Sequence, residues 1–394
     1  MKKLQIIALT LSLLLLASCG AQPDATTAPA GTTAAATTAT AATTVAVQAA
    51  PGEIKNIILI IGDGMGPEQI EAGELIKGEN FVFHDWQHTT ANTNSLDSDG
   101  RPTKVTDSAA GGTALSTGTL TTNSYVGKDS DKNDLQTIMD HAKTYGKATG
   151  VVSTDSINGA TPASFSGHSV DRNDTQTILY TQLDSGIDLL CANATTDAAN
   201  MLSFIKKAGY DYCNNFSQVK KSLESEKVYW QFNMSGTSAT DKLENVVPYC
   251  LDFLDDDPDG FVLMIEQGHI DKYCHSNEIE GAQLMANSLN NTVEAVLAWA
   301  DGRTDTAIII TADHETGALK VDSEKKFPTK YAYGGNSLYY MFNSEGHSDT
   351  PVPVYVYGFE ADFTPYWLDE TQTVIKNISV FSIMLDLLEN PIRE

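Results

Sequence analysis

Residues 57–70 read IILIIGDGMGPEQI, an apolar run that ends abruptly at Asp63, a carboxylate set between two glycines. An uninterrupted apolar run of this length is typical of a buried strand. Ligands of open α/β sheets bind at the carboxyl ends of the strands, and glycines let the backbone turn sharply there. The stretch therefore predicts that Asp63 lies at the ligand-binding edge of a buried sheet.

Strand-like and helix-like segments alternate along the rest of the chain. The longest predicted helix covers residues 276–299, in which Met285, Leu289, Val293 and Val296 recur at helical spacing. Apolar runs predict buried strands at Lys55–Ile61, Ala148–Ser153, Ile187–Cys191, Lys227–Phe232, Gly260–Glu266, Thr306–Thr311 and Val352–Tyr357. The alternation predicts an α/β fold with a mostly parallel central sheet in a single domain.

The first 19 residues have the composition of an export signal. Lys2 and Lys3 precede an apolar segment, residues 4–16, that is too short to span a membrane. Small residues and then Cys19 follow it, which resembles the lipobox of bacterial lipoproteins. We expect a signal peptide at residues 1–18, a lipidated Cys19, and an extracytoplasmic protein anchored to the cell membrane on its surface or periplasmic side. The alternative is an ordinary secretory signal with an incidental cysteine.

Residues 19–50 are rich in alanine and threonine, contain no aromatic residue and carry almost no charge. Such a segment cannot build a core, so it is predicted to be a tether, and the folded domain is expected at residues 51–394. The whole chain carries a formal net charge of −26. That charge argues against nucleic acid as a specific partner, because phosphate backbones require basic surfaces. It also means that an anionic substrate must meet positive charge at a local site.

Four further cysteines, Cys191, Cys213, Cys250 and Cys274, could form disulfides in an exported protein. Four cysteines allow three pairings, and the sequence leaves all three open. None of the four has zinc-finger spacing.

Acidic and histidine residues gather at the ends of the predicted strands. Together they are four carboxylates and three imidazoles. The members are Asp63 at the end of the first strand, Glu266, Asp271 and His275 at the end of another, Asp313 and His314 after a third, and His347 before a fourth. Asp271 and His275 are four residues apart, so one helical turn would aim both at one ion. All seven are ligand types for divalent metals. Because burying them unpaired would be costly, the pattern predicts two or three divalent cations, which would also supply the local positive charge.

The segment VTDSAAGGTALSTG, residues 105–118, places Ser108 before small residues that can begin a helix. The N-terminus of such a helix would point backbone N–H groups at an anion. No histidine lies near Ser108 in the sequence, so activation by a metal ion is favoured over a Ser-His-Asp triad. Arg172 could supply a bidentate fork for a phosphate. Without the metal ligands, the same residues would indicate only a capped helix and a surface arginine.

Six motifs stand in the order and approximate spacing of the alkaline phosphatases: IGDGMG, TDSAAGGTALSTG, ATPASFSGHSVDR, IEQGHIDKYCH, TADHETG and GHS. From about Lys55 to its C-terminus the chain therefore resembles that family, as a bacterial lipoprotein-type member. The resemblance implies a central sheet with helices on both faces, and a phosphomonoester hydrolase with two Zn²⁺ ions and one Mg²⁺ ion. It also implies a phosphoserine intermediate and is compatible with a homodimer.

The resemblance implies roles for individual residues as well. The first zinc ion would be held by Asp271, His275 and His347, and the second by Asp63, Asp313 and His314. The magnesium ion would be held by Asp63, Thr161 and Glu266. Ser108 matches the nucleophile, Arg172 the phosphate clamp, and Lys272 a lysine found in some members, which would bind substrate.

One position departs from the family pattern. Gly159 stands where relatives usually carry an aspartate or histidine that supports the magnesium or phosphate region. This predicts a weakened magnesium site, unless a neighbour such as Asp155 or Asn158 reaches the same waters.

Two rival functions are considered. The nearest is a phosphodiesterase or phosphonate hydrolase of the same superfamily, whose members commonly use threonine as nucleophile and lack this arginine. Ser108 together with Arg172 favours monoesters. The second is a surface lipoprotein that only binds metal or phosphate, and a full ligand set around a nucleophile argues against it.

Overall fold

The apolar run forms β1 (Asn56–Gly62), an inner strand of a ten-stranded sheet. It pairs in parallel with β9 (Phe261–Gln267) on one side and with β10 (Thr306–Thr311) on the other. All seven residues of β1 are buried, as expected for a strand covered on both faces. The strand predicted from the sequence is therefore confirmed at the centre of the fold.

The computed structural model describes residues 53–391 apart from 195–199, 217–218, 223, 234–241, 369–370 and 372. All of them fall within one unit of the chain, residues 48–394. The predicted signal peptide, Cys19 and most of the tether fall outside the described residues.

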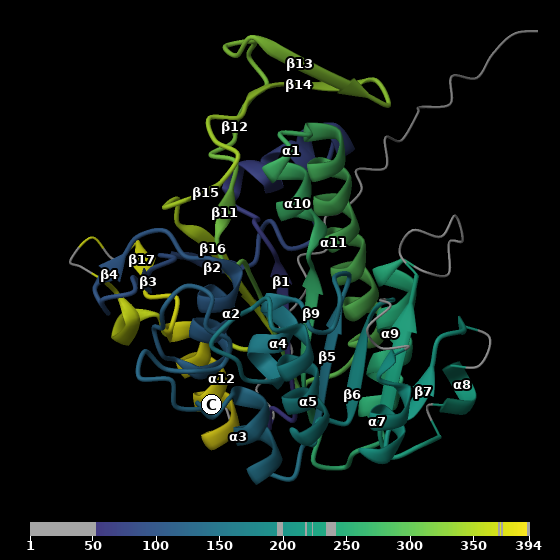
Figure 1. Ribbon diagram of the computed structural model, residues 1–394. Helices are drawn as coiled ribbons and strands as arrows, with labels where there is room; N and C mark the ends of the chain where they lie inside the picture. The colour runs from purple at the N-terminus through teal and green to yellow at the C-terminus, as the bar shows by residue number, and fades with distance from the viewer. Residues whose placement is uncertain are drawn as a thin grey trace, which may run out of the picture. The chain divides into compact units, whose positions relative to one another are not determined.

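Seven more strands complete the sheet: β2 (Gln87–Ala91), β5 (Ala148–Ser153), β6 (Leu189–Asn193), β7 (Asp211–Cys213), β8 (Val228–Phe232), β16 (Val352–Tyr357) and β17 (Val374–Ile375). Their order is β17-β2-β16-β10-β1-β9-β5-β6-β8-β7 (Figure 1). Neighbours are parallel except where β16 meets β10 and β2, to both of which it is antiparallel. The mostly parallel sheet is thus confirmed.

The reversed direction of β16 matters for the site. In an antiparallel pair the first residues of one strand lie beside the last residues of the other. The start of β16 therefore lies at the same sheet edge as the carboxyl ends of β1, β9 and β10. His347, which precedes β16, reaches the ligand-binding edge for this reason.

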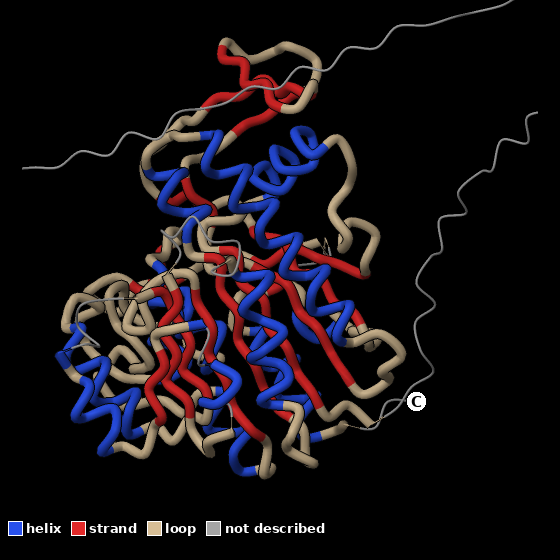
Figure 2. Tube along the Cα trace, turned by 90° about the vertical axis from the view of Figure 1, so that its right-hand side faces the viewer, coloured by secondary structure: helices blue, strands red, loops and turns tan. Residues whose placement is uncertain are grey.

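Two groups of helices accompany the sheet (Figures 1 and 2). The first consists of α1 (Pro67–Lys77), α9 (Leu243–Leu254), α10 (His269–His275) and α11 (Ile279–Trp299). The second consists of α2 (Ser108–Thr117), α3 (Ile138–Thr144), α4 (Ala160–Ser166), α5 (Thr175–Asp184) and α12 (Ser379–Glu389). Both groups contact β5 and β9, and β9 is buried along its whole length, so helices cover both faces of the sheet.

Smaller elements lie around this core. The short helices are α7 (Leu202–Lys207), α8 (Val219–Ser222) and the 3₁₀ turn η3 (Thr364–Tyr366). Three small sheets are formed by β3 (Ser95–Leu96) with β4 (Pro102–Thr103), by β11 (Glu315–Thr316) with β15 (His347–Ser348), and by β12 (Lys320–Asp322), β14 (Asn336–Met341) and β13 (Thr329–Tyr333). The last of these packs on α1 through β12 and β14.

The sequence located the apolar elements well and the others poorly. All seven predicted strands exist, each within two residues of its expected ends. The predicted helix at 276–299 is α11, which begins at Ile279 because a separate short helix, α10, precedes it. Strands β2, β7 and β17 were not predicted, because β2 is largely exposed at its start and β7 and β17 have only three and two residues.

The four cysteines of the folded part are all buried and free, so the structure contains none of the three pairings that the sequence left open. Among the described helices, none combines the length and the apolar character needed to cross a membrane.

Candidate active site

The carboxyl edge of the sheet collects the residues that the sequence singled out. Asp63 follows β1, and Asp313 and His314 follow β10. Glu266 is the next-to-last residue of β9, and β9 leads into α10, which carries Asp271 and His275. His347 arrives from β15. The ligand-type residues therefore come from four separate segments of the chain, and all four segments meet at one edge of the sheet.

A first cluster consists of Asp271, His275 and His347. His275 Nε2 lies 3.2 Å from Asp271 Oδ1 and 3.2 Å from His347 Nε2, and His347 Nε2 lies 3.6 Å from Asp271 Oδ1. Ligands in a tetrahedral zinc site with bonds of about 2.0–2.1 Å stand about 3.3 Å apart. The spacing of the three atoms therefore suits one such ion.

The other ring nitrogens fix how these histidines present themselves. Nδ1 of His275 bonds to the carbonyl oxygen of Glu345, and Nδ1 of His347 lies 2.7 Å from that of Thr106. A carbonyl only accepts, so both Nδ1 atoms carry the proton and both neutral rings offer an Nε2 lone pair. Two lone pairs 3.2 Å apart require a cation or a proton between them.

A second cluster consists of Asp63, Asp313 and His314, all buried. His314 Nε2 lies 3.4 Å from Asp63 Oδ1 and 3.2 Å from Asp313 Oδ2. Thr316 Oγ1 donates to Asp271, so it must accept from Nδ1 of His314, which lies 3.2 Å away. His314 Nε2 is thereby left with a lone pair.

The carboxylates of this second cluster supply the decisive observation. Asp63 Oδ1 and Asp313 Oδ2 are buried without a hydrogen-bond partner among the described residues. Buried polar atoms in proteins are almost always paired, so two orphaned oxygens facing one imidazole lone pair indicate a cation-binding site. The residues present thus fit a divalent metal.

The two clusters adjoin each other. The rings of His314 and His347 stack with their centroids 3.5 Å apart. One ligand atom from each of Asp271, His314 and His347 also falls within 4.8 Å of the others. The arrangement can therefore hold two neighbouring ions.

A third set of oxygens lies beside the second cluster. Glu266 is buried, and its Oε2 accepts a hydrogen bond from Ser153. Thr161, near the start of α4, has a buried Oγ1 that forms no well-aligned hydrogen bond with the described residues, although its proximity helps to lower the pKa of Glu266. With Asp63 these make an all-oxygen set, which suits magnesium better than zinc.

Burial and crowding change the acidity of these groups. Burial and the charges of Asp271 and Glu266 raise the pKa of Asp313 to about 8, and burial and Asp155 raise that of Glu266 to about 7. Burial and its carboxylate neighbours raise the pKa of Asp63 well above its ordinary value. A hydrogen bond with Asp271 raises the pKa of His275 to about 9. Without metal, these sites therefore hold protons where the cations would bind.

Ser108 is the first residue of α2 and meets the second cluster. Its Oγ lies 3.1 Å from His314 Nε2. Asp107 caps the helix by accepting from the backbone N–H of Ala110, and its Oδ2 lies 3.0 Å from Arg172 NH1. The nucleophile candidate, a helix N-terminus and a guanidinium thus converge beside the ligand clusters.

Lys272 lies apart from this convergence. Its side chain is half exposed, and its Nζ forms a 2.8 Å ion pair with Asp155 Oδ1. Asn158, the other neighbour considered near Gly159, is buried, and its amide donates to the carbonyl of Thr175.

Comparison with known proteins places the chain in a family. The alkaline phosphatase family model matches residues 54–188 and 186–365, which is most of the chain. The chain belongs to the alkaline phosphatase family. The resemblance found in the six sequence motifs is thereby confirmed.

Individual members of the alkaline phosphatase family show how far the similarity extends. Alkaline phosphatase 4 of Bacillus subtilis is 31% identical over 68% of this chain, and alkaline phosphatase 3 of the same organism is 32% identical over 69%. The matched region spans 63% of the length of each of these two relatives. Among solved structures, the cold-active alkaline phosphatase of a psychrophilic Shewanella superposes with a TM-score of 0.74 at 25% identity, covering 84% of this chain and 99% of that one.

The family motifs did not reveal the groups that orient the ligands. The carbonyls of Thr106 and Glu345 hold two of the histidines, but a backbone oxygen has no signature in a sequence. Thr316, which orders His314, does lie in the TADHETG motif and could have been singled out. The contact between Ser108 and His314 joins residues 206 positions apart, which no local reading detects.

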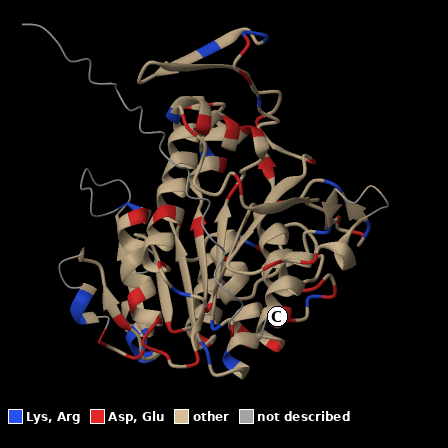
Figure 3. Cartoon of the chain, turned by 180° about the vertical axis from the view of Figure 1, so that it is seen from behind, with Lys and Arg blue, Asp and Glu red and all other residues tan. Residues whose placement is uncertain are grey.

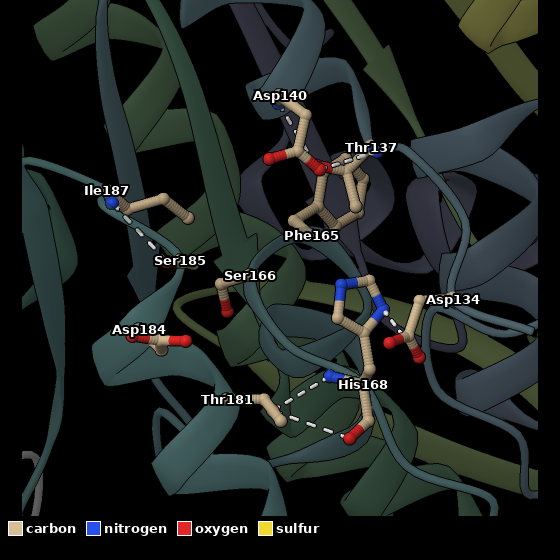
Figure 4. Close-up of a pocket in the computed structure, with 10 residues that line it drawn as sticks. All are labelled: Asp134, Thr137, Asp140, Phe165, Ser166, His168, Thr181, Asp184, Ser185 and Ile187. Atoms are coloured by element: carbon tan, nitrogen blue, oxygen red, sulfur yellow. Dashed lines mark hydrogen bonds and ion pairs between the residues drawn. The ribbon is translucent and has the colours of Figure 1, made fainter.

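A separate cavity of about 230 Å³ lies at the other end of α4 from Thr161 (Figure 4). It is lined by Asp134, Thr137, Asp140, Phe165, Ser166, His168, Thr181, Asp184, Ser185 and Ile187. Several of its polar groups already have partners: Asp140 accepts from Thr137, and His168 Nδ1 lies 2.8 Å from the carbonyl of Gly127. No candidate ligand of the alkaline phosphatase motifs lines it, so it is not part of the site.

The distribution of charge over the described chain agrees with the net negative charge of the sequence. Figure 3 shows Lys and Arg scattered among more numerous Asp and Glu. An anion approaching this member of the alkaline phosphatase family therefore needs the positive charge that cations in the clusters would provide.

Proposed function

We propose that this chain is a metal-dependent phosphomonoester hydrolase that acts through a phosphoserine on Ser108. The observation that carries the proposal is the position of Ser108 Oγ, at a helix N-terminus and beside two adjoining clusters of metal-ligand side chains, the nearer of which holds two orphaned carboxylate oxygens. Membership of the alkaline phosphatase family supports it.

Each ligand set has a proposed occupant. Asp271, His275 and His347 would hold one Zn²⁺ ion, and Asp63, Asp313 and His314 a second. Asp63, Thr161 and Glu266 would hold Mg²⁺. Bound divalent ions supply Lewis acidity at phosphoryl oxygens and lower the pKa of a nearby hydroxyl.

The chain's own residues perform two displacements at phosphorus. Ser108 Oγ forms a bond to phosphorus as the bond to the ester oxygen breaks, and the alcohol leaves. Water then attacks the same phosphorus, the bond to Ser108 Oγ breaks, and inorganic phosphate departs. Arg172, held in place by Asp107, offers its fork to two phosphoryl oxygens. The N-terminus of α2 adds backbone N–H groups that stabilise the negative charge of the same phosphoryl group.

Substrate binding by Lys272 stays a prediction, because its ammonium is paired with Asp155.

The substrate class can be tested directly. The metal-loaded protein should release p-nitrophenol from p-nitrophenyl phosphate at least about a hundred-fold faster than from bis(p-nitrophenyl) phosphate, since a diester lacks one of the free oxygens that the Arg172 fork and the clusters would hold. A preference for the diester would assign the site to the phosphodiesterase rival. No turnover of either ester by zinc-loaded protein would leave only metal or phosphate binding.

We also propose that Cys19 carries a lipid that anchors the protein to the extracytoplasmic side of the cell membrane. The support is the small residues between the apolar segment and Cys19, and the core-free composition of residues 19–50. The homodimer and the lack of a specific nucleic-acid partner stay predictions.

The anchor predicts a change of location without a change of chemistry. Wild type should sediment with membranes and partition into detergent, whereas Cys19→Ala should lose the lipid, because no thiol remains to accept it. Cys213→Ala, which removes a buried thiol of the folded part, is the matched control and should stay anchored. Mass spectrometry that finds an unmodified Cys19 in the mature membrane-bound protein would contradict the assignment.

A further inference from the structure

The side chain of Asp155 occupies a slot between two glycines. A Cβ on Gly159 would lie 3.0 Å from the carbonyl oxygen of Ser156 and 3.2 Å from Asp155 Oδ2, and a Cβ on Gly268 would lie 3.2 Å from Asp155 Cβ. Neither glycine is required by its backbone, because φ is −62° at Gly159 and −81° at Gly268, values that any residue adopts. Glycine at these two positions therefore leaves room for the side chain of Asp155, and at position 159 also for the carbonyl of Ser156.

The slot opens onto the third set of oxygens. The same Cβ position on Gly268 lies 3.5 Å from the Glu266 carboxyl carbon. The side chains of Asp155 and Glu266 therefore lie on either side of the space next to Gly268. The backbone N–H of Asp155 donates to Ser153 Oγ at 2.8 Å, and Ser153 in turn donates to Glu266. The charge of Asp155 is also felt at Glu266, whose pKa it raises after burial. Asp155 is thus linked to Glu266 by a chain of hydrogen bonds, and its negative charge acts on the Glu266 carboxylate.

The outer face of Asp155 holds a cation of the protein itself. Its Oδ1 accepts from the backbone N–H of Ser156 and lies 2.8 Å from Lys272 Nζ. Lys272 directly follows Asp271, a member of the first cluster, so an unpaired ammonium there would repel divalent ions in the clusters.

We propose that Asp155 is a positioning residue for the magnesium site, which takes in space the place that a side chain at position 159 would fill. Its carboxylate lies next to Glu266 and balances the positive charge of Lys272. Magnesium keeps several of its waters, so its affinity depends on groups outside the ligand set that orient those waters and balance their charge. This inference rests on the proposed metal site, and it replaces the expectation that Gly159 leaves that site weakened.

Two substitutions break the same ion pair with opposite consequences. Asp155→Asn leaves the Lys272 charge unbalanced and should weaken Mg²⁺ binding about ten-fold or more, the range typical of such supporting groups. Lys272→Met leaves the Asp155 charge unbalanced and should leave Mg²⁺ binding as tight as in wild type or tighter. If the pair only held the fold together, both variants would weaken binding in the same direction.

The measurement uses zinc-loaded full-length protein titrated with MgCl₂ by calorimetry, together with the rise in Tm on adding Mg²⁺. Asp301→Asn, which removes one exposed carboxylate outside the site, is the matched control for net charge and should bind Mg²⁺ like wild type. The double variant Asp155→Ala, Gly159→Asp should regain Mg²⁺ affinity relative to Asp155→Ala, because it brings a carboxylate back to the room that Asp155 vacates. The carbonyl oxygen of Ser156, 3.0 Å from the new Cβ, has to shift by a few tenths of an ångström to accept it.

The outcomes separate this inference from the proposed function. Zinc uptake with equal Mg²⁺ affinity in wild type and Asp155→Asn, or weakening by both Asp155→Asn and Lys272→Met, would overturn the role of Asp155 alone. Failure of the wild type to take up zinc at all would instead overturn the proposed function.

Discussion

Ser108→Ala should lower the release of phosphate from a monoester by at least about a thousand-fold while leaving the fold and the zinc content unchanged. The reason is that Ser108 brings its hydroxyl to the second cluster from the first position of α2, so its loss removes the covalent route and leaves only binding and charge stabilisation. Quenching wild type in acid during turnover should trap phosphate on Ser108, which peptide mass spectrometry can locate.

Ser116→Ala is the matched control, since Ser116 lies on the same helix and is equally buried. Its hydroxyl donates to the carbonyl of Ser164 at 2.6 Å, so the variant should lose some stability but keep its turnover rate. A phosphate label on another residue, combined with full activity in Ser108→Ala, is the result that would remove Ser108 from the mechanism.

Removing the divalent ions should abolish activity and lower Tm, by more at high pH than at neutral pH. Glu266, Asp313 and His275 have pKa values raised to about 7, 8 and 9 in the metal-free fold. A group whose pKa is raised by folding contributes stability that is lost as the pH climbs through the folded value. The metal-free protein should therefore lose stability steadily between about pH 6.5 and pH 9.

The metal-loaded protein should behave differently in the same range, because cations replace the protons. Its Tm should lie of the order of 10 °C higher, since ligand at 1,000 times Kd adds about 4 kcal/mol and more than one ion binds. His275→Ala should lose much of this gain, whereas His84→Ala, a histidine paired with Glu74 outside the site, should keep it. Full activity in exhaustively metal-free protein, or a Tm that ignores metal, would contradict the reading of both clusters.

The sequence predicted those parts of the site that depend on local spacing. Asp271 and His275 are one helical turn apart on α10, and Nε2 of His275 lies 3.2 Å from Oδ1 of Asp271. Asp63 could be placed at a sheet edge because the apolar run before it is long and unbroken. Ser108 begins a helix, as its small neighbours predicted.

Other parts of the site depend on partners that are distant in the chain. His347 reaches the edge only because β16 runs against its neighbours, and strand direction is not written in an apolar run. Its orientation depends on the carbonyl of Thr106, 241 positions away. The role proposed for Asp155 depends on its position next to Gly159 and Gly268. A sequence shows that these two residues lack side chains, but it does not show which neighbour lies in the space they leave.

The position of β1 between β9 and β10 has a consequence for how the chain acquires its site as it is synthesised. Residues 57–61 pair with residues 262–266, and residues 56–61 pair with residues 306–311, so β1 waits for neighbours that are made more than 200 residues later. A chain interrupted before residue 306 lacks β10, so one edge of β1 stays unpaired and Asp63 has neither of its cluster partners. Such long-range pairing makes folding slow, and the waiting strand is exposed to aggregation. Metal capture by the second cluster therefore waits until Asp313 and His314 have been made, and chains truncated before them should be removed as unfolded protein.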